Sequence, residues 1–116
     1  MSTELTQAVV ARLLENNISF IQGYKYPTIF KNYRKASIVI LNSDGTKTLM
    51  ECREQNVSGT TDEKLPFLAL SMQAAIGKDG IVDAVLIHAG SGFREEALQW
   101  VTENTKVKLE AYHGDI

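Results

Sequence analysis

The chain is short of the residues that build disulfide scaffolds and zinc sites. Its 116 residues include one cysteine, Cys52, and two histidines, His88 and His113. A lone cysteine excludes an internal disulfide and a cysteine zinc cage, and two scattered histidines are too few for a histidine metal site. The sequence also lacks a run of eighteen apolar residues and a charged start followed by an apolar core, so we expect neither a membrane span nor a secretory signal. These absences favour an intracellular, cytoplasmic protein.

An excess of positive charge is also lacking. The 12 Lys and Arg residues are outnumbered by 14 Asp and Glu residues, so the net charge is -2. No global positive field therefore points to nucleic acid, and any contact with DNA must come from a local patch. The best candidate is the segment 24–35, where cations and aromatic residues alternate, as suits phosphate contacts and base or sugar packing. Its cations are Lys25, Lys31, Arg34 and Lys35, and its aromatic residues are Tyr24, Tyr26, Phe30 and Tyr33. A solvated loop with a few anchoring aromatic residues is an equally open interpretation.

A chain of this length forms one domain, residues 1–116, around a single core. Its apolar periodicity and turn signals predict a helix, three strands, a helix, a strand, a helix and a strand, or α-β-β-β-α-β-α-β. The predicted elements are a helix from Ser2 or Thr3 to Asn16, strands at 18–24, 36–42 and 49–55, a helix from a Thr60–Glu63 capping box, a strand at 82–89, a helix from Phe93 through Val101, and a strand at 107–112. The segment 27–35 is expected to be an irregular connection. This order predicts an α/β fold with a mixed central sheet flanked by helices on both faces.

The strands at 36–42 and 49–55 carry the residues of greatest chemical interest. They flank a turn at Ser43-Asp44-Gly45, which predicts a hairpin. The second strand ends in Glu51-Cys52-Arg53-Glu54-Gln55. Alternate residues of a strand share a face, so one carboxylate, one cation and one amide are expected side by side. This combination suits the binding of a phosphodiester, whereas a simple exposed ion pair between Glu51 and Arg53 is the plainer alternative.

The order of elements, the strand end at 51–55 and the helix start at 59–66 resemble the PD-(D/E)XK, or restriction-endonuclease-like, nuclease superfamily. In that family an Asp opens the second strand, and a Glu or Asp two residues before a Lys ends the third. The carboxylates hold one or two magnesium ions, and the Lys orients or activates the attacking water. The resemblance implies that Glu51 binds the metal, that Gln55 supplies the common amide and that Glu15 provides an accessory carboxylate.

Two positions depart from the pattern of the family. Ser37 stands where the first Asp is expected, and Arg53 stands where the Lys is expected. A serine hydroxyl is a poor ligand for magnesium, and an arginine binds phosphate well but stays protonated. Three explanations are open: a working variant site that recruits Glu15 or Glu54, a degenerate member kept for binding, or a deliberately inactivated sequence.

The resemblance leads us to expect a small Mg²⁺-dependent DNA endonuclease of phage or mobile-element type, with Mn²⁺ as a substitute ion. The residues assigned to catalysis are Glu51, Arg53, Ser37 and Gln55, those assigned to the metal are Glu51 and Glu15, and those assigned to nucleic acid are Lys25, Lys31, Arg34, Lys35 and Lys64. Cutting both strands of a duplex requires two such domains or sequential nicks, which favours a symmetric homodimer. The main alternative is a degenerate domain that binds nucleic acid or protein without cleavage, and another is a generic α/β domain whose motif is coincidental.

Overall fold

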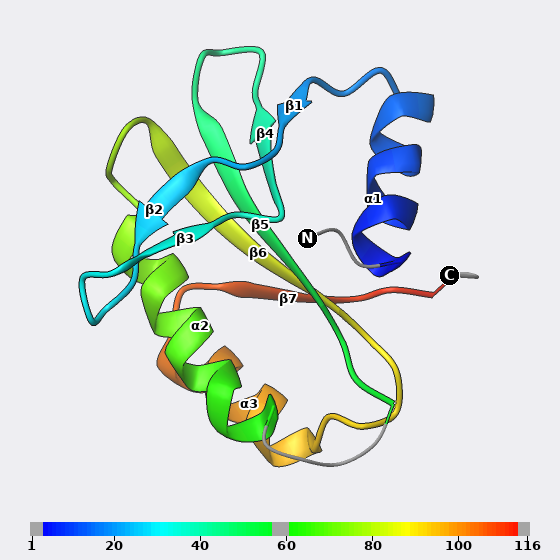
Figure 1. Cartoon of the computed structure of the whole chain (residues 1–116), viewed down its shortest axis with the longest axis vertical. Coiled ribbons are helices and arrows are strands. Elements are labelled where there is room, and N and C mark those ends of the chain that lie inside the picture. Colours follow the sequence, from blue (N-terminus) through cyan, green and yellow to red (C-terminus); the bar gives the residue numbers. More distant parts are fainter. Residues whose placement is uncertain (1–3, 57–60, 114–116) are drawn as a thin grey trace.

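A mixed β-sheet with helices on both faces forms the centre of the computed structural model (Figure 1), which describes residues 4–56 and 61–113. The elements are α1 (Glu4–Glu15), β1 (Phe20–Ile21), β2 (Lys25–Pro27), β3 (Tyr33–Lys35), β4 (Ile38–Leu41), β5 (Lys47–Glu54), α2 (Thr61–Ala75), β6 (Ile81–Ala89), α3 (Glu95–Asn104) and β7 (Lys108–Ala111). None of the helices in these ranges has the length and hydropathy needed to span a membrane.

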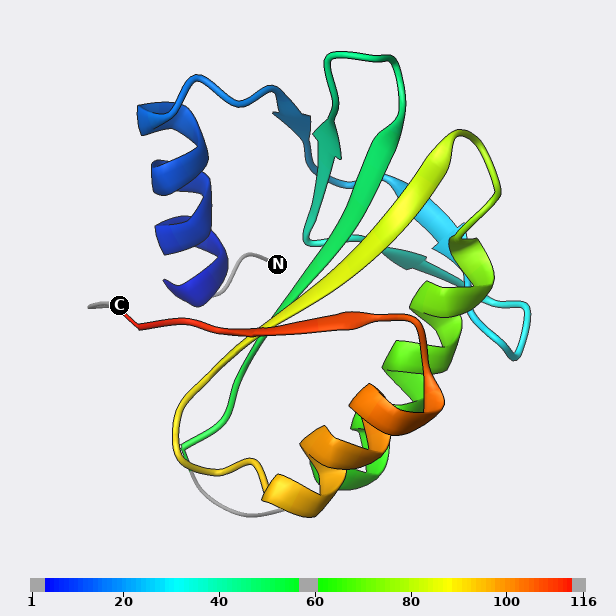
Figure 2. The same ribbon diagram turned by 180° about the vertical axis from the view of Figure 1, so that it is seen from behind.

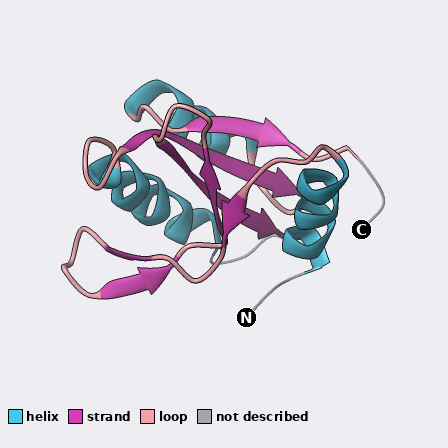
Figure 3. Ribbon diagram, turned by 90° about the horizontal axis from the view of Figure 1, so that it is seen from above, coloured by secondary structure: helices cyan, strands magenta, loops and turns pink. Residues whose placement is uncertain are grey.

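Five strands form the sheet in the order β1-β4-β5-β6-β7. β4 pairs antiparallel with both β1 and β5, whereas β5 and β6 are parallel, as are β6 and β7. Helices α2 and α3 provide the crossovers that parallel neighbours require. Figures 2 and 3 show α1 on one face of the sheet and these two helices on the other. The predicted mixed sheet with helices on both faces is therefore confirmed.

Alternation along β5 divides the core between the two faces of the sheet. Met50 and Cys52 pack with Leu5 of α1 in one buried cluster, and Leu49 packs with residues of α2 and α3 in the other. Glu51 follows the alternation and lies on the same face as Leu49, where it contacts Tyr26 of that second cluster. The strand pattern thus buries a carboxylate in the layer between the sheet and α2.

The segment 18–35 differs from its prediction. Only Phe20–Ile21 pairs with the sheet, because Gly23 adopts a φ of +77° and turns the chain away from β4. β2 begins between the predicted strand and the segment 27–35 expected to be irregular, and β3 lies within that segment; the two strands form a separate antiparallel ribbon with Tyr26 opposite Arg34. The ribbon crosses the α2 side of the sheet (Figure 1) and carries part of the predicted basic patch. The predicted capping residue Thr60 lies outside the described residues, as does the side chain of Glu63.

Candidate functional site

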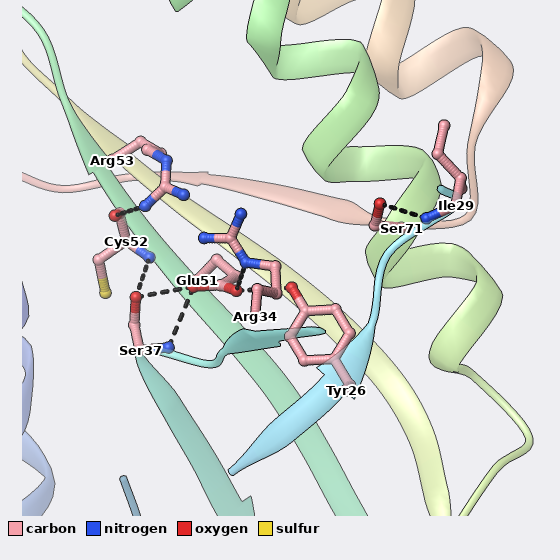
Figure 4. A network of polar contacts seen from close by, with 8 residues as sticks. All are labelled: Tyr26, Ile29, Arg34, Ser37, Glu51, Cys52, Arg53 and Ser71. Carbon is pink, nitrogen blue, oxygen red and sulfur yellow. Dashed lines mark hydrogen bonds and ion pairs between the residues drawn. The ribbon is translucent and has the colours of Figure 1, made fainter. Parts of the chain in front are cut away.

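Glu51 is the centre of a polar network in the middle of β5. Its side chain is fully buried, and its carboxylate accepts four hydrogen bonds (Figure 4). Oε2 accepts from the Tyr26 hydroxyl at 2.6 Å and from Arg34 Nε at 3.0 Å. Oε1 accepts from the Ser37 amide at 3.0 Å and from the Ser37 hydroxyl at 2.8 Å. One carboxylate therefore ties β5 to both strands of the ribbon and to the residue that precedes β4.

The partners of Glu51 are suited to an ionised carboxylate. Arg34 forms an ion pair with it, and the Arg34 side chain is 24% exposed while that of Glu51 is fully buried. Burial raises the pKa of the Tyr26 hydroxyl, and the charge and hydrogen bond of Glu51 raise it further. The phenol consequently stays protonated, and its hydroxyl can donate the hydrogen bond to Glu51.

Arg53 places a second guanidinium beside that of Arg34. Its Nη1 donates to the Cys52 carbonyl at 3.0 Å, and Figure 4 shows the two guanidinium groups turned toward the same space. Burial lowers the pKa of Arg53, and the positive charge of Arg34 lowers it as well, although Glu51 opposes both effects. Arg53 nevertheless remains a cation at neutral pH. The proximity of the two guanidinium groups makes this a favourable place for an additional anion.

Two adjoining cavities share Arg34 and Arg53 in their walls, and we call them together the cationic groove. Their volumes are about 300 and 420 Å³. The first is also lined by Thr6, Gln22, Gly23, Lys35, Ala36 and Ser37, and the second by Glu54, Lys64, Leu65, Phe67 and Leu68. Four cations and one carboxylate, Glu54, thus line the groove among the described residues, which favours an anionic ligand.

Gln55 directly follows β5, and both its side chain and its backbone bind the loop after β6. Its Nε2 donates to the Gly92 carbonyl at 3.3 Å, and its own carbonyl accepts from the Gly92 amide at 2.7 Å. Gly90 also approaches closely, since a Cβ there would overlap the Gln55 carbonyl oxygen. The side chain is therefore engaged with the loop after β6 and not with Glu51.

Glu15 is not brought to Glu51. It is the exposed last residue of α1, whereas Thr6 of the same helix lines the cationic groove. Glu15 follows Thr6 by nine positions, or about 14 Å along the helix axis at about 1.5 Å per residue. The other proposed recruit, Glu54, lines the second cavity and accepts a hydrogen bond from Asn56.

The predicted basic residues divide into two groups. Arg34, Lys35 and Lys64 line the cationic groove, whereas Lys25 lies opposite Lys35 in the ribbon and Lys31 lies in its turn. Their contact with nucleic acid stays a prediction. The structure also shows that Arg34 forms an ion pair with Glu51.

Sequence reasoning missed the roles of two aromatic residues. The sequence pattern predicts Tyr26 to be one of the aromatic residues of a surface patch, but it is buried and donates to Glu51. Phe67 lines the second cavity from α2. The available signal for Phe67 was its spacing, because it follows Lys64 by three residues and so shares a helix face with a predicted DNA contact.

The residues around Glu51 do not fit a magnesium ion in this arrangement. Both carboxylate oxygens already accept two hydrogen bonds each, and the neighbouring charges are the cations Arg34 and Arg53. Magnesium requires nearly octahedral coordination by oxygen atoms, usually with ionised carboxylates. Within residues 4–56 and 61–113, no three acidic, histidine or cysteine side chains gather where they could hold a metal ion. The Ser37 hydroxyl, at the position of the expected Asp, donates to Glu51 instead of serving as a ligand.

Comparison with known proteins identifies the family. A search of curated proteins found no match. The crystal structure of AF1548, a protein of unknown function, superposes with a TM-score of 0.59 and 18% sequence identity, over 92% of this chain and 57% of that one. This likeness supports the fold, and the chain spans little more than half the length of AF1548. The family model for the PD-(D/E)XK nuclease superfamily domain matches residues 5–114. The chain therefore belongs to the PD-(D/E)XK nuclease superfamily.

Proposed function

We propose that this domain binds the phosphodiester backbone of nucleic acid through Arg34 and Arg53, without a metal ion on Glu51. The observation that supports this most is the pairing of two guanidinium groups around a carboxylate whose acceptor positions are already filled. Guanidinium groups recognise phosphate with two parallel hydrogen bonds, and their charge is permanent. Glu51 then acts as the anchor that fixes Arg34, and Arg53 lies beside it.

Both arginines keep donors for a ligand. The contact of Arg34 with Glu51 uses Nε, and Figure 4 shows its terminal nitrogens turned away from the carboxylate. Arg53 uses Nη1 on a backbone carbonyl, which leaves the rest of its guanidinium facing the cationic groove. A phosphate in the groove would relieve the repulsion between the two cations. Lys35 and Lys64, on either side, extend the same attraction to neighbouring phosphates.

Titration of a labelled oligonucleotide in EDTA tests this proposal. We expect binding that weakens as salt increases, because phosphate contacts release counterions. Arg53→Ala removes a charge-assisted contact, so affinity should fall by roughly 10- to 100-fold. Lys106→Ala is the matched control, since Lys106 is exposed and does not line the groove. Equal affinities of the Arg53→Ala variant and the native protein would refute the proposed phosphate site.

Mg²⁺-dependent DNA cleavage is the competing proposal, and membership of a nuclease superfamily is the observation that favours it. It would require Arg34 to leave Glu51 and a further carboxylate to approach. Nicking of supercoiled plasmid with Mg²⁺, Mn²⁺ or EDTA separates the two proposals. The proposed binding function predicts no nicking by the native protein. The double variant Ser37→Asp, Arg53→Lys restores the family pattern, so nicking by that variant alone would support a native domain that binds without cleavage.

The predicted homodimer belongs with the cleavage proposal, since a duplex has two strands to cut. Size-exclusion chromatography with light scattering would test it independently of activity. Metal-dependent nicking by a native dimer would favour the endonuclease, and nicking that Glu51→Ala abolishes would assign that activity to this site.

A further inference from the structure

Two aromatic rings stack at the rim of the cationic groove. Phe30, in the turn of the ribbon, packs against Phe67 of α2 with ring centroids 5.1 Å apart and planes inclined by 36°. Phe67 lines the second cavity together with Arg34 and Arg53. Phe30 nevertheless remains 77% exposed. A large apolar ring is thus presented to solvent next to Phe67, which lines the groove that contains the proposed phosphate site.

The turn that carries Phe30 is fixed to the body of the domain. The Ile29 amide donates to the hydroxyl of Ser71 at 3.1 Å, and Ser71 is fully buried on α2 (Figure 4). The Thr28 amide donates to the Asn32 carbonyl at 2.7 Å and closes the turn. Ser71 follows Phe67 by four residues, so the hydrogen bond and the ring contact use one face of α2. The Phe30 ring is therefore held in place before any ligand arrives, which lowers the entropy cost of binding.

A third ring continues this surface along the ribbon. Tyr33 is 70% exposed and lines a further cavity with Lys25, Arg34 and Lys35. Lys25 and Lys35 are directly opposite each other in the ribbon. Like charges in that arrangement destabilise a strand pair, and an anion beside them would reverse this effect. Cations and exposed rings consequently lie together from the groove to the outer part of the ribbon.

We infer that this surface binds single-stranded nucleic acid in preference to a duplex, with phosphates on Arg34 and Arg53 and unpaired bases stacked on Phe30, Phe67 or Tyr33. The inference rests on the proposed function and adds the class of nucleic acid. In a duplex the base faces are covered by their neighbours, and proteins reach only the base edges in the grooves. A single strand offers base faces and phosphates together, and each stacked base contributes about 5- to 100-fold in affinity.

Fluorescence anisotropy with the full chain in EDTA tests the inference. The probes are strands about 12 nucleotides long: single-stranded DNA, RNA of the same sequence, the DNA duplex, and a fully abasic DNA strand with the same phosphates. We expect DNA or RNA single strands to bind at least about tenfold more tightly than the duplex and the abasic strand. Binding of either single strand supports the inference, and the tighter of the two identifies the preferred sugar.

Variants of Phe30 connect this preference to the ring. Phe30→Ala should weaken single-strand binding by about fivefold or more, while abasic-strand binding stays unchanged. Phe30→Leu keeps an apolar contact with Phe67 but removes the aromatic face, so it should show the same loss even if the alanine variant folds poorly. Leu14→Ala is the control, because Leu14 is 63% exposed on α1, on the other face of the sheet, and should leave affinity unchanged.

The possible failures are distinguishable. Equal affinity for the native and abasic strands, or tighter binding of the duplex, would overturn the single-strand inference, while the phosphate site would still stand through its salt and Arg53 dependence. Absence of binding to every probe would overturn both. Loss of affinity in the Leu14→Ala control equal to that of Phe30→Leu would also contradict a role for the ring.

Discussion

Replacing Glu51 with alanine distinguishes two roles for this residue. Loss of a structural anchor should lower the free energy of unfolding, whereas loss of a metal-binding carboxylate should leave it unchanged or raise it. The substitution removes the acceptor of four hydrogen bonds. The Tyr26 hydroxyl is buried and loses its partner, the Ser37 amide loses its acceptor, and each unsatisfied donor costs about 1 to 3 kcal/mol. Arg34 is about a quarter exposed and regains water, so its contribution is discounted. We expect the free energy of unfolding to fall by about 3 to 5 kcal/mol, the usual cost of removing one partner of a buried ion pair.

Thermal and urea unfolding followed by circular dichroism measures this loss. For a domain of this size the melting temperature should fall by roughly 12 to 20 °C. Glu15→Ala is the matched control, since the family resemblance assigned both carboxylates to the metal but only Glu51 is buried in this network. The control should change the free energy of unfolding by no more than about 0.5 kcal/mol.

Glu51→Gln strengthens the test because it keeps the size of the side chain. Each carboxylate oxygen accepts two donors, so either orientation of the amide would set its NH₂ group against donors. We therefore expect a loss of at least about 2 kcal/mol despite the similar shape. Unchanged or raised stability in both Glu51 variants would refute the anchor, since removal of a strained catalytic carboxylate commonly stabilises a protein.

Further predictions concern other parts of the same framework. Tyr26→Phe removes only the hydroxyl that donates to Glu51, and urea unfolding should show a loss of about 1.5 to 3 kcal/mol; no change would contradict the hydrogen bond. Gly90→Ala places a methyl group against the Gln55 carbonyl at a φ of +91°, so the melting temperature should fall by roughly 10 °C or more, and an unchanged value would refute this close approach. Burial raises the pKa of the Cys52 thiol to about 11, so its protonated form persists well above neutral pH and thiolate appears only as the pH nears that value. At pH 8 iodoacetamide should therefore alkylate the native protein roughly 200-fold more slowly than the unfolded chain, and comparable rates by mass spectrometry would contradict this environment.

The sheet and the central hairpin could be predicted from local patterns in the sequence. Period-two alternation in the segment 49–55 places Glu51 and Arg53 on one face, and the turn at Ser43-Asp44-Gly45 sets β4 beside β5. Crossover helices between the later strands imply parallel pairing, which the structure shows for β5, β6 and β7. These features depend on neighbours in sequence and on general rules of sheet connection.

The identity of the cation beside Glu51 could not be predicted in the same way. Arg34 reaches the carboxylate because Gly23 turns the chain into a ribbon that crosses the sheet, and this path depends on tertiary packing. Alternation in the short ribbon places Tyr26 and Arg34 on its inner face and leaves Lys25 and Lys35 outside. The sequence pattern places these cations and aromatic rings in one patch. The fold divides the patch into residues that bind Glu51, which are Tyr26 and Arg34, and exposed residues on the surface of the ribbon.

The distance of Glu15 from the site also depends on tertiary structure. A helix packed on a sheet can present either end to a given strand, and α1 brings Thr6 to the groove while Glu15 lies about 14 Å further along its axis at about 1.5 Å per residue. The resemblance supplied a role for Glu15 but not the orientation of the helix that carries it. Gln55 lies one residue beyond the end of β5, where the close approach of Gly90 and Gly92 engages it with a neighbouring loop.

Binding of a labelled single strand, measured by anisotropy in EDTA and again in magnesium, tests the central claim most directly. If the paired arginines bind phosphate while Glu51 serves as their anchor, the dissociation constant should agree within about twofold between the two conditions once ionic strength is matched. The strand should also be recovered intact from both samples. Binding that appears only with magnesium, or a strand cut only in that sample, would contradict the claim, because either result would require a bound metal ion.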